Sequence, residues 1–253
     1  MKTLIHSILA TMSILLLMAL CTTGYDNGKD VIKKIDNLVD SVPNDSISQD
    51  SIVKISCRKL NDIAKIYNIE VATIKAVSFI EAGPEHTGFI KYGSPIVHLE
   101  VSMFKKMLQK AGYDVDSLSK LHPEALGPLK KDKYGSAILA QKAQFDSAAA
   151  INDSLAKICT YWGMFQIRGS NWRQCGSASL DDFIAQMCKS ETSQLDLFVK
   201  FITNTGLHKY LIAKDWESFA KAYNGKGYVR NRYHIRLEQA YRRFAAQKND
   251  SIR

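Results

Sequence analysis

The sequence predicts a mainly α-helical (α+β) protein with one short β element near the start of its folded part. Apolar residues recur at three- and four-residue steps in segments spread between about residues 57 and 247, which is the spacing of a buried helix face. The stretch GFIKYGSPIVHLE (88–100) changes period and carries Gly-Ser-Pro at 93–95. This pattern is typical of short extended runs joined by turns, so we expect a small β-hairpin there.

The predicted helices follow one another with few other elements between them. Two helical patterns, Asn61–Tyr67 and Ala72–Glu81, precede the extended runs. The later ones cover roughly 101–111, 135–157, 180–190, 192–204, 215–223 and 230–247. Ser179, followed by two aspartates, gives the helix at 180 an N-cap and an acidic first turn. These elements predict one domain over residues 57–253.

The composition fits a globular protein with an anionic partner. The chain has 253 residues, of which 46% are hydrophobic and 23% charged, so wholesale disorder is excluded. Its net charge of +9 favours binding to nucleic acid, anionic lipid or an acidic cell-wall polymer. The charge alone does not choose among these three.

The first 24 residues have the layout of a secretory signal peptide. Lys2 precedes an apolar run over 8–20 that is short for a membrane span, although an uncleaved anchor is the alternative. Cys21 follows at once, as in a bacterial lipoprotein signal, but Leu20 stands where such signals have a small residue. We therefore expect export, to the periplasm, to the membrane as a lipoprotein anchored through Cys21, or to the medium. Export argues against nucleic acid as a partner.

A polar linker and four cysteines follow the signal. Residues 25–56 are rich in Asp, Ser, Asn and Lys and read as a tether. Four cysteines remain after Cys21, at positions 57, 159, 175 and 188. In an oxidising compartment they could form two disulfides by any of three connectivities, or stay as buried thiols. Their spacing does not indicate a metal site, and we expect no metal or cofactor.

Three stretches place polar side chains where a core does not require them. Glu81 lies at the end of the helix in AVSFIEAG (76–83), on the same face as Ile74 and Val77. YWGMFQIRGSNW (161–172) is an aromatic run with the single polar side chain Gln166 between apolar neighbours. AYNGKGY (222–228) ends a helix in Tyr-Asn-Gly. Each alone has a structural explanation: a solvated helix end, a core segment or a helix C-cap.

Together and in this order, the three stretches resemble the bacterial and phage N-acetylmuramidase family of the lysozyme-like superfamily. The resemblance rests on Glu81 at a helix end, GMFQI at 163–167 and AYNGKG at 222–227, and it covers about residues 60–245. It implies a lysozyme-like fold with a small β-hairpin element. Two departures are Ala82, where the family commonly has Ser, and Val101, where it has Arg.

The resemblance implies that Glu81 is the catalytic acid. Cleaving a glycosidic bond at neutral pH needs a carboxyl group whose pKa is raised, and burial against Ile74, Val77 and Ile80 would raise it. Glu81 would also act as general base in the second half of the reaction. Glu100, at the end of the extended segment, is the favoured second carboxylate, ahead of Glu85 and Asp114. A mechanism assisted by the substrate's N-acetyl group stays open.

The same resemblance implies a set of substrate-binding residues. The side-chain amides of Gln166 and Asn224 can hydrogen-bond an N-acetyl group, and aromatic rings can pack against sugar rings. The predicted substrate-binding residues are Tyr161, Phe165, Gln166, Ile167, Tyr223, Asn224 and Tyr228. The Trp172 ring is a further candidate for contact with a sugar, whereas Trp162 is predicted to be a core residue.

The predicted activity is therefore hydrolysis of the β-1,4 bond between N-acetylmuramic acid and N-acetylglucosamine in peptidoglycan. The alternatives are a lytic transglycosylase acting on the same bond and a non-catalytic peptidoglycan-binding lipoprotein. The expected partner is the peptidoglycan glycan strand, without nucleic acid, and we expect a monomer.

Overall fold

The structure is a computed structural model that describes residues 55–82 and 87–250. The predicted signal peptide, Cys21 and nearly all of the predicted linker lie outside these residues. None of the helices in the described part of the chain is both long enough and apolar enough to cross a membrane.

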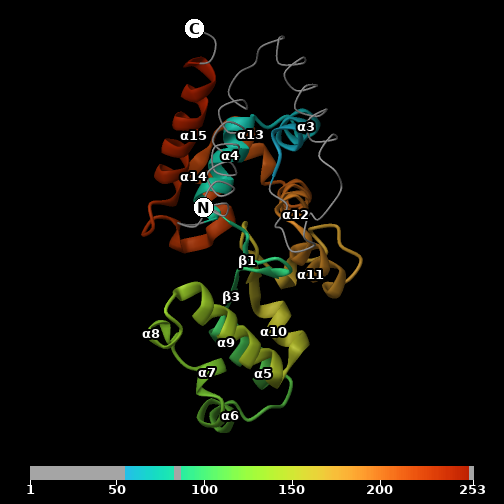
Figure 1. Cartoon of the computed structure of the whole chain (residues 1–253), viewed down its shortest axis with the longest axis vertical. Helices are drawn as coiled ribbons and strands as arrows, with labels where there is room; N and C mark the ends of the chain where they lie inside the picture. Colours follow the sequence, from blue (N-terminus) through green and yellow to red (C-terminus); the bar gives the residue numbers. More distant parts are fainter. Residues whose placement is uncertain (1–54, 83–86, 251–253) are drawn as a thin grey trace, which may run out of the picture.

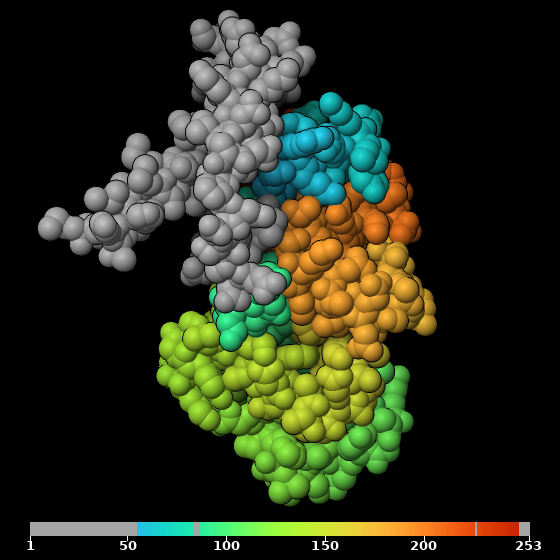
Figure 2. Space-filling model, turned by 45° about the vertical axis from the view of Figure 1, so that its right-hand side comes forward, coloured from blue at the N-terminus to red at the C-terminus, as the bar shows by residue number. Residues whose placement is uncertain are grey.

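The helices form two groups with the strands between them (Figure 1). The first group is α3 (Cys57–Tyr67), α4 (Val71–Glu81), α11 (Leu180–Lys189), α12 (Glu191–Asn204), α13 (His208–Ala213), α14 (Trp216–Asn224) and α15 (Tyr233–Asp250). The second is α5 (Val101–Lys110), α6 (Val115–Leu121), α7 (Pro123–Leu126), α8 (Lys131–Tyr134), α9 (Ala137–Ile151) and α10 (Asp153–Cys159). Figure 2 shows the green and yellow residues of the second group gathered at one end, opposite the blue residues of α3. The predicted mainly α fold class is confirmed.

The strands form two small antiparallel sheets. β1 (Phe89–Lys91) pairs with β2 (Ser94–Pro95), which confirms the extended runs predicted over 88–100. β3 (Val97–Leu99) pairs instead with β4 (Thr160–Trp162), which pairs with β5 (Ile167–Arg168). The sequence pattern did not predict β4 and β5, because β4 pairs with a strand about 60 residues earlier in the chain and β5 has only two residues.

One face of the three-stranded sheet packs into the core. Val97, Leu99 and Trp162 are buried, and the Trp162 ring meets the Phe145 ring of α9 edge to face at 5.0 Å. Trp162 is only 3% exposed, so its prediction as a core residue is confirmed.

The helix predicted over 135–157 is in fact two helices. Asn152 interrupts it with an extended backbone (φ −158°), and its side chain caps α10 by accepting from the Leu155 amide at 3.0 Å. Asparagine favours such caps over helix interiors because its side chain competes for backbone hydrogen bonds. The short helices α6, α7, α8 and α13 also escaped prediction, since four to seven residues hold too little of an apolar stripe.

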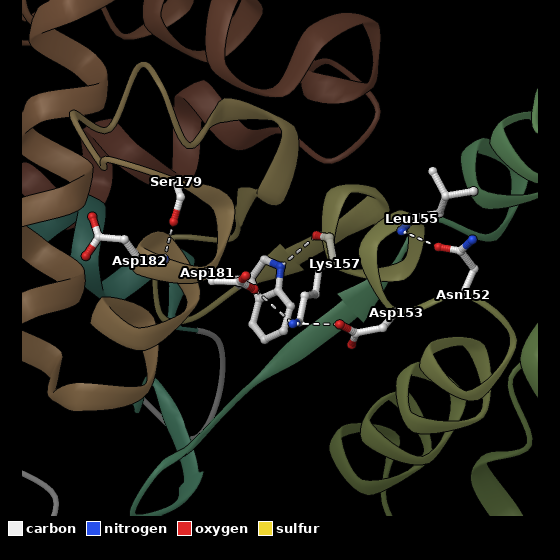
Figure 3. A network of polar contacts seen from close by, with 8 residues as sticks. Asn152, Asp153, Leu155, Lys157, Ser179, Asp181 and Asp182 are labelled. Atoms are coloured by element: carbon white, nitrogen blue, oxygen red, sulfur yellow. Dashed lines mark hydrogen bonds and ion pairs between the residues drawn. The ribbon is translucent and has the colours of Figure 1, made fainter.

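Lys157 joins α10 to α11, as Figure 3 shows. Its Nζ lies 2.7 Å from Asp153 Oδ2 within α10 and 3.1 Å from Asp181 Oδ1 in the first turn of α11. The Ser179 hydroxyl oxygen accepts from the Asp182 amide at 3.0 Å, which confirms the predicted N-cap of α11.

The last helix, α15, lies along α4 (Figure 1). Leu237 and Ala240 are buried on its inner face, and Phe244 meets Phe79 of α4 edge to face with ring centroids 5.8 Å apart. Tyr233, the first residue of α15, lies one turn before Leu237 on the same face of the helix. The packing of α15 against α4 therefore places Tyr233 near the end of α4.

Candidate active site

Glu81 is the last residue of α4 and stands at the centre of the site. Ala82 is the C-cap of this helix: its amide still donates to the Ser78 carbonyl at 2.9 Å, but its ψ of −9° departs from the helical value. Ile74 and Val77 on the same face are buried, as predicted. Glu81 itself is half-buried, and burial raises the pKa of its carboxyl group to about 7.

Two residues of α15 oppose that rise. The Tyr233 hydroxyl donates a hydrogen bond to Glu81 Oε1, and the Arg236 guanidinium acts on the same carboxylate through its charge. Both favour the ionised form and lower the pKa of Glu81, but the desolvation is larger. Glu81 is therefore a carboxyl group that is both oriented and close to balance between its acid and base forms at neutral pH.

Tyr233 is a site residue that the sequence analysis missed. It is 6% exposed, and burial together with the Glu81 charge raises its pKa well above the ordinary value, so it stays a neutral donor. The available signal was the stripe formed by Tyr233, Leu237 and Ala240, since a tyrosine on a buried face usually requires a partner for its hydroxyl. The stripe does not say which residue that partner is.

The stretch AYNGKGY places Tyr223 and Asn224 next to this pair. The Tyr223 hydroxyl donates to the Phe165 carbonyl at 2.6 Å, and its pKa is raised well above the ordinary value by burial and then by Glu81. Asn224 is exposed at the end of α14 and lies close enough to Tyr233 to lower the pKa of its hydroxyl, the smallest of the effects on that group. The structure thus brings together Glu81, Tyr223 and Asn224, three of the residues singled out in the sequence.

Tyr228 is turned toward other neighbours. It ends the 3-10 helix η2 (Gly225–Tyr228), and its hydroxyl donates to Glu217 Oε1 at 3.0 Å. Its ring packs edge to face against His234, with centroids 5.4 Å apart. Its predicted contact with substrate stays a prediction.

The GMFQI stretch forms the turn between β4 and β5. Gln166 adopts a left-handed backbone (φ 46°), and its Nε2 donates to the Gly163 carbonyl at 2.9 Å, which leaves its amide oxygen available. The Phe165 ring is fully buried and stacks on Phe198 at 4.4 Å, while Ile167 is 2% exposed. Both side chains thus lie in the core beneath the turn, and their predicted contact with sugar stays a prediction.

A buried amide from α12 holds this turn in place. Gln194 is fully buried, and its Oε1 accepts from the Met164 amide at 2.7 Å while its Nε2 donates to the Met187 carbonyl at 2.9 Å. A Cβ on Gly163 would lie 2.7 Å from this side chain, so glycine is required where the turn meets it. The sequence analysis did not single out Gln194, since a lone glutamine within a helix carries no pattern.

Glu100 lies at the other end of the sheet from the turn. It caps α5 after the end of β3, and its Oε1 accepts from the Ser102 hydroxyl at 2.8 Å. Within the described residues no contact joins Glu100 to Glu81, so the role of second carboxylate stays a prediction. Of the weaker candidates, Asp114 caps α6 in the second helix group, and Glu85 lies outside the described residues.

The two remaining predicted rings are half-buried. Tyr161 is the middle residue of β4, on the side of the sheet opposite the buried Trp162. The Arg173 guanidinium carbon lies 4.1 Å from the centroid of the Trp172 ring. Both stay predicted contacts of a sugar.

The described residues contain no cluster of three or more His, Cys, Asp or Glu able to hold a metal ion. Cys159, Cys175 and Cys188 are free thiols, which excludes the two-disulfide alternative. Burial raises the pKa of Cys159 to about 11 and that of Cys175 to about 12, so both are inert core residues.

Comparison with known proteins shows which family this chain belongs to. The N-acetylmuramidase family matches residues 70–245, a span that holds every segment of the site. The chain belongs to this family. Among solved structures, the endolysin of Burkholderia phage AP3 is 30% identical, with a TM-score of 0.62 over 76% of this chain and 71% of the endolysin. No curated protein matches the chain.

Family membership makes the protein a muramidase, a glycoside hydrolase of peptidoglycan, and confirms the resemblance read from its motifs. The muramidase fold, mainly α with a small antiparallel sheet, agrees with that of the phage endolysin. Glu81 therefore stands in an enzyme that needs a proton donor.

Proposed function

We propose that this muramidase hydrolyses the β-1,4 bond between N-acetylmuramic acid and N-acetylglucosamine, with Glu81 as general acid and then general base. The observation that supports this most is the state of Glu81, whose carboxyl group is held by Tyr233 and has its pKa raised to about 7. A group with that pKa is about half protonated at neutral pH, so both of its forms are available to the reaction.

The proton balance of the proposed reaction is simple. Protonated Glu81 gives its proton to the bridging oxygen as the bond between that oxygen and the anomeric carbon breaks. The remaining carboxylate then takes a proton from a water molecule whose oxygen bonds to the anomeric carbon. The Tyr233 hydrogen bond and the Arg236 charge favour this carboxylate, so they support the state that follows proton donation.

Glu100 is proposed as the second carboxylate, acting opposite Glu81. It directly follows β3. Just before the start of that strand, the Ile96 carbonyl accepts from the Gly163 amide of the turn at 2.8 Å. Gln166 and Asn224 are proposed to bind the N-acetyl group. None of the described residues donates a hydrogen bond to the Gln166 amide oxygen, and Asn224 is exposed.

Digestion of purified peptidoglycan sacculi tests the proposal. Glu81→Gln keeps the shape of the side chain and should lower the release of fragments by at least ~100-fold. Glu124→Gln is the matched control, because Glu124 pairs with Lys133 in the second helix group, and it should digest like the wild type. Glu100→Gln tests the second carboxylate separately.

The masses of the products decide among the alternatives. Hydrolysis leaves reducing N-acetylmuramic acid ends, whereas a lytic transglycosylase leaves 1,6-anhydro ends that are one water lighter. Glu81→Gln digesting as fast as the wild type would reject Glu81 as the acid. Binding to sacculi with no Glu81-dependent release would favour the non-catalytic alternative.

We further propose that the protein reaches peptidoglycan by export through its predicted signal. The mass of the mature N-terminus tests this, because a lipidated protein would begin at Cys21 and an uncleaved anchor at Met1.

A further inference from the structure

The three-stranded sheet has one face that the core does not use. Along each strand buried residues alternate with half-buried or exposed ones. His98, Tyr161 and Arg168 are direct cross-strand neighbours, His98 opposite Tyr161 and Tyr161 opposite Arg168. Because cross-strand partners share a face, these three side chains form one row on the side away from the core.

The row consists of an aromatic ring between two nitrogen-rich groups. The His98 ring centroid lies 6.2 Å from that of Tyr161, and the Arg168 guanidinium carbon lies 5.9 Å from the same ring centroid on the other side. The His98 side chain lies at the surface, and its Nδ1 is 2.8 Å from Gln141 Nε2. Desolvation by neighbouring groups lowers the pKa of its imidazole, which favours the neutral form. With Gln141 donating to Nδ1, His98 presents its Nε2–H as a free donor.

Arg168 is a half-buried cation whose hydrogen-bond partners among the described residues are neutral. Its Nε donates to the Ser170 hydroxyl at 2.9 Å, and one terminal nitrogen lies 3.6 Å from the Met103 sulfur. Across the described residues, none of the ion pairs includes Arg168. Glu100 lies in the same region, since the charges of Arg168 and Glu100 both affect the pKa of the Cys159 thiol. A partly desolvated guanidinium without a carboxylate favours an anionic ligand, and its planar fork matches a carboxylate.

The row is joined through β4 to the turn beside the candidate active site. β4 runs from Tyr161 into the Gly163 turn, whose Phe165 carbonyl accepts from Tyr223, and Tyr223 is close enough to Glu81 to respond to its charge. Tyr161 is two residues from the turn, about 7 Å along the strand. The row and the turn that contacts Tyr223 therefore belong to one continuous β4–β5 hairpin.

We propose that His98, Tyr161 and Arg168 form a subsite for a carboxylate-bearing sugar of the glycan strand. The Tyr161 ring lies against the sugar, His98 donates to it, and Arg168 binds the carboxylate. The proposal rests on the proposed function, since in peptidoglycan the acidic sugar is N-acetylmuramic acid. The carboxylate belongs either to its lactyl group or to the stem peptide attached there.

Calorimetric titration of the Glu81→Gln variant tests the subsite without cleavage. The probes are a tetrasaccharide of alternating N-acetylglucosamine and N-acetylmuramic acid with free lactyl carboxylates, the same compound as its methyl amide, and the same compound carrying stem peptides. N-acetylglucosamine tetrasaccharide is the neutral reference. We expect one acidic form, lactyl or peptide-bearing, to bind about 10-fold more tightly than the amide, as a charge-assisted hydrogen bond provides. Which acidic form shows the preference identifies the source of the carboxylate.

Arg168→Gln, added to Glu81→Gln, should remove this preference and leave the affinity for the neutral tetrasaccharide unchanged. Arg242→Gln is the control, since Arg242 pairs with Glu238 within α15, and it should keep the preference. Equal affinities for the acidic and amide forms in the protein with Arg168 intact would overturn the subsite, and so would a preference that survives Arg168→Gln.

These outcomes also separate the subsite from the proposed function. If the wild type digests sacculi in a Glu81-dependent way but no acid preference exists, only the subsite is lost. If none of the glycans binds and no sacculi are digested, both proposals fail. An acid preference that depends on Arg168 without any digestion would keep the subsite and reject the enzyme mechanism.

Discussion

Replacing Glu81 by glutamine should stabilise the folded protein at pH 8 and leave its stability unchanged at pH 4. Burial raises the pKa of Glu81 from its ordinary 4.5 to about 7, so folding favours the protonated form. At 1.36 kcal/mol for each pKa unit, the ionised carboxylate costs the native state about 3 kcal/mol above pH 7. Below pH 4.5 the group is protonated in both the folded and unfolded states, and the cost is absent. Stability is lost as the pH rises from 4.5 through 7.

The assay is urea denaturation of the wild type and Glu81→Gln at pH 4 and pH 8. Glutamine keeps an oxygen that can accept from Tyr233, so the comparison isolates the charge. Glu124→Gln should behave in the opposite sense, because its contacts with Lys133 and then Tyr134 lower the pKa of Glu124 to about 2. That contribution is present above pH 4.5 and is lost as the pH falls through 2. Equal stabilities of the wild type and Glu81→Gln at pH 8 would refute the desolvation argument.

Two further predictions concern the groups around Glu81. Tyr233→Phe removes a hydrogen bond that favours the carboxylate, so the pKa of Glu81 should rise above 7, and the alkaline limb of the pH–activity profile should move up with it. A carboxyl titration followed by ¹³C NMR would read the same change without substrate. If neither the limb nor the titration moves, Tyr233 has no part in the mechanism. Gly163→Ala places a Cβ 2.7 Å from the Gln194 side chain at a residue whose φ is +68°. It should lower the free energy of unfolding, measured by urea denaturation, by roughly 2 to 4 kcal/mol. A loss under about 0.5 kcal/mol would show that the turn can shift away from Gln194.

The sequence predicted local structure where one helix face or one cap decides it. Ser179 is an N-cap in the structure, because a serine before two aspartates needs only its own neighbours to act as one. Glu81 stands on the buried face of α4, because spacing along a single helix fixes that. Asn152 shows the limit of this reasoning, since the periodicity continues through it although its side chain ends one helix and caps the next.

The site residues divide in the same way. The resemblance carried by three motifs in order singled out Glu81, Tyr223 and Asn224, which the fold gathers. Spacing could not tell that the Phe165 ring faces the core while its carbonyl faces Tyr223, because a two-residue strand carries too little alternation to orient a side chain.

By itself, the sequence determined that a carboxyl group ends a buried helix in a mainly α protein, and its motifs indicated the muramidase family. Only the tertiary structure decided how that carboxyl group is protonated. Its pKa depends on desolvation by neighbours and on the Tyr233 hydrogen bond, which comes from a residue 152 positions later in the chain. The row of His98, Tyr161 and Arg168 likewise exists only because strands about 60 residues apart pair in one register. Helix periodicity is a local property of the chain, whereas burial and strand register are set by residues that meet only when it folds.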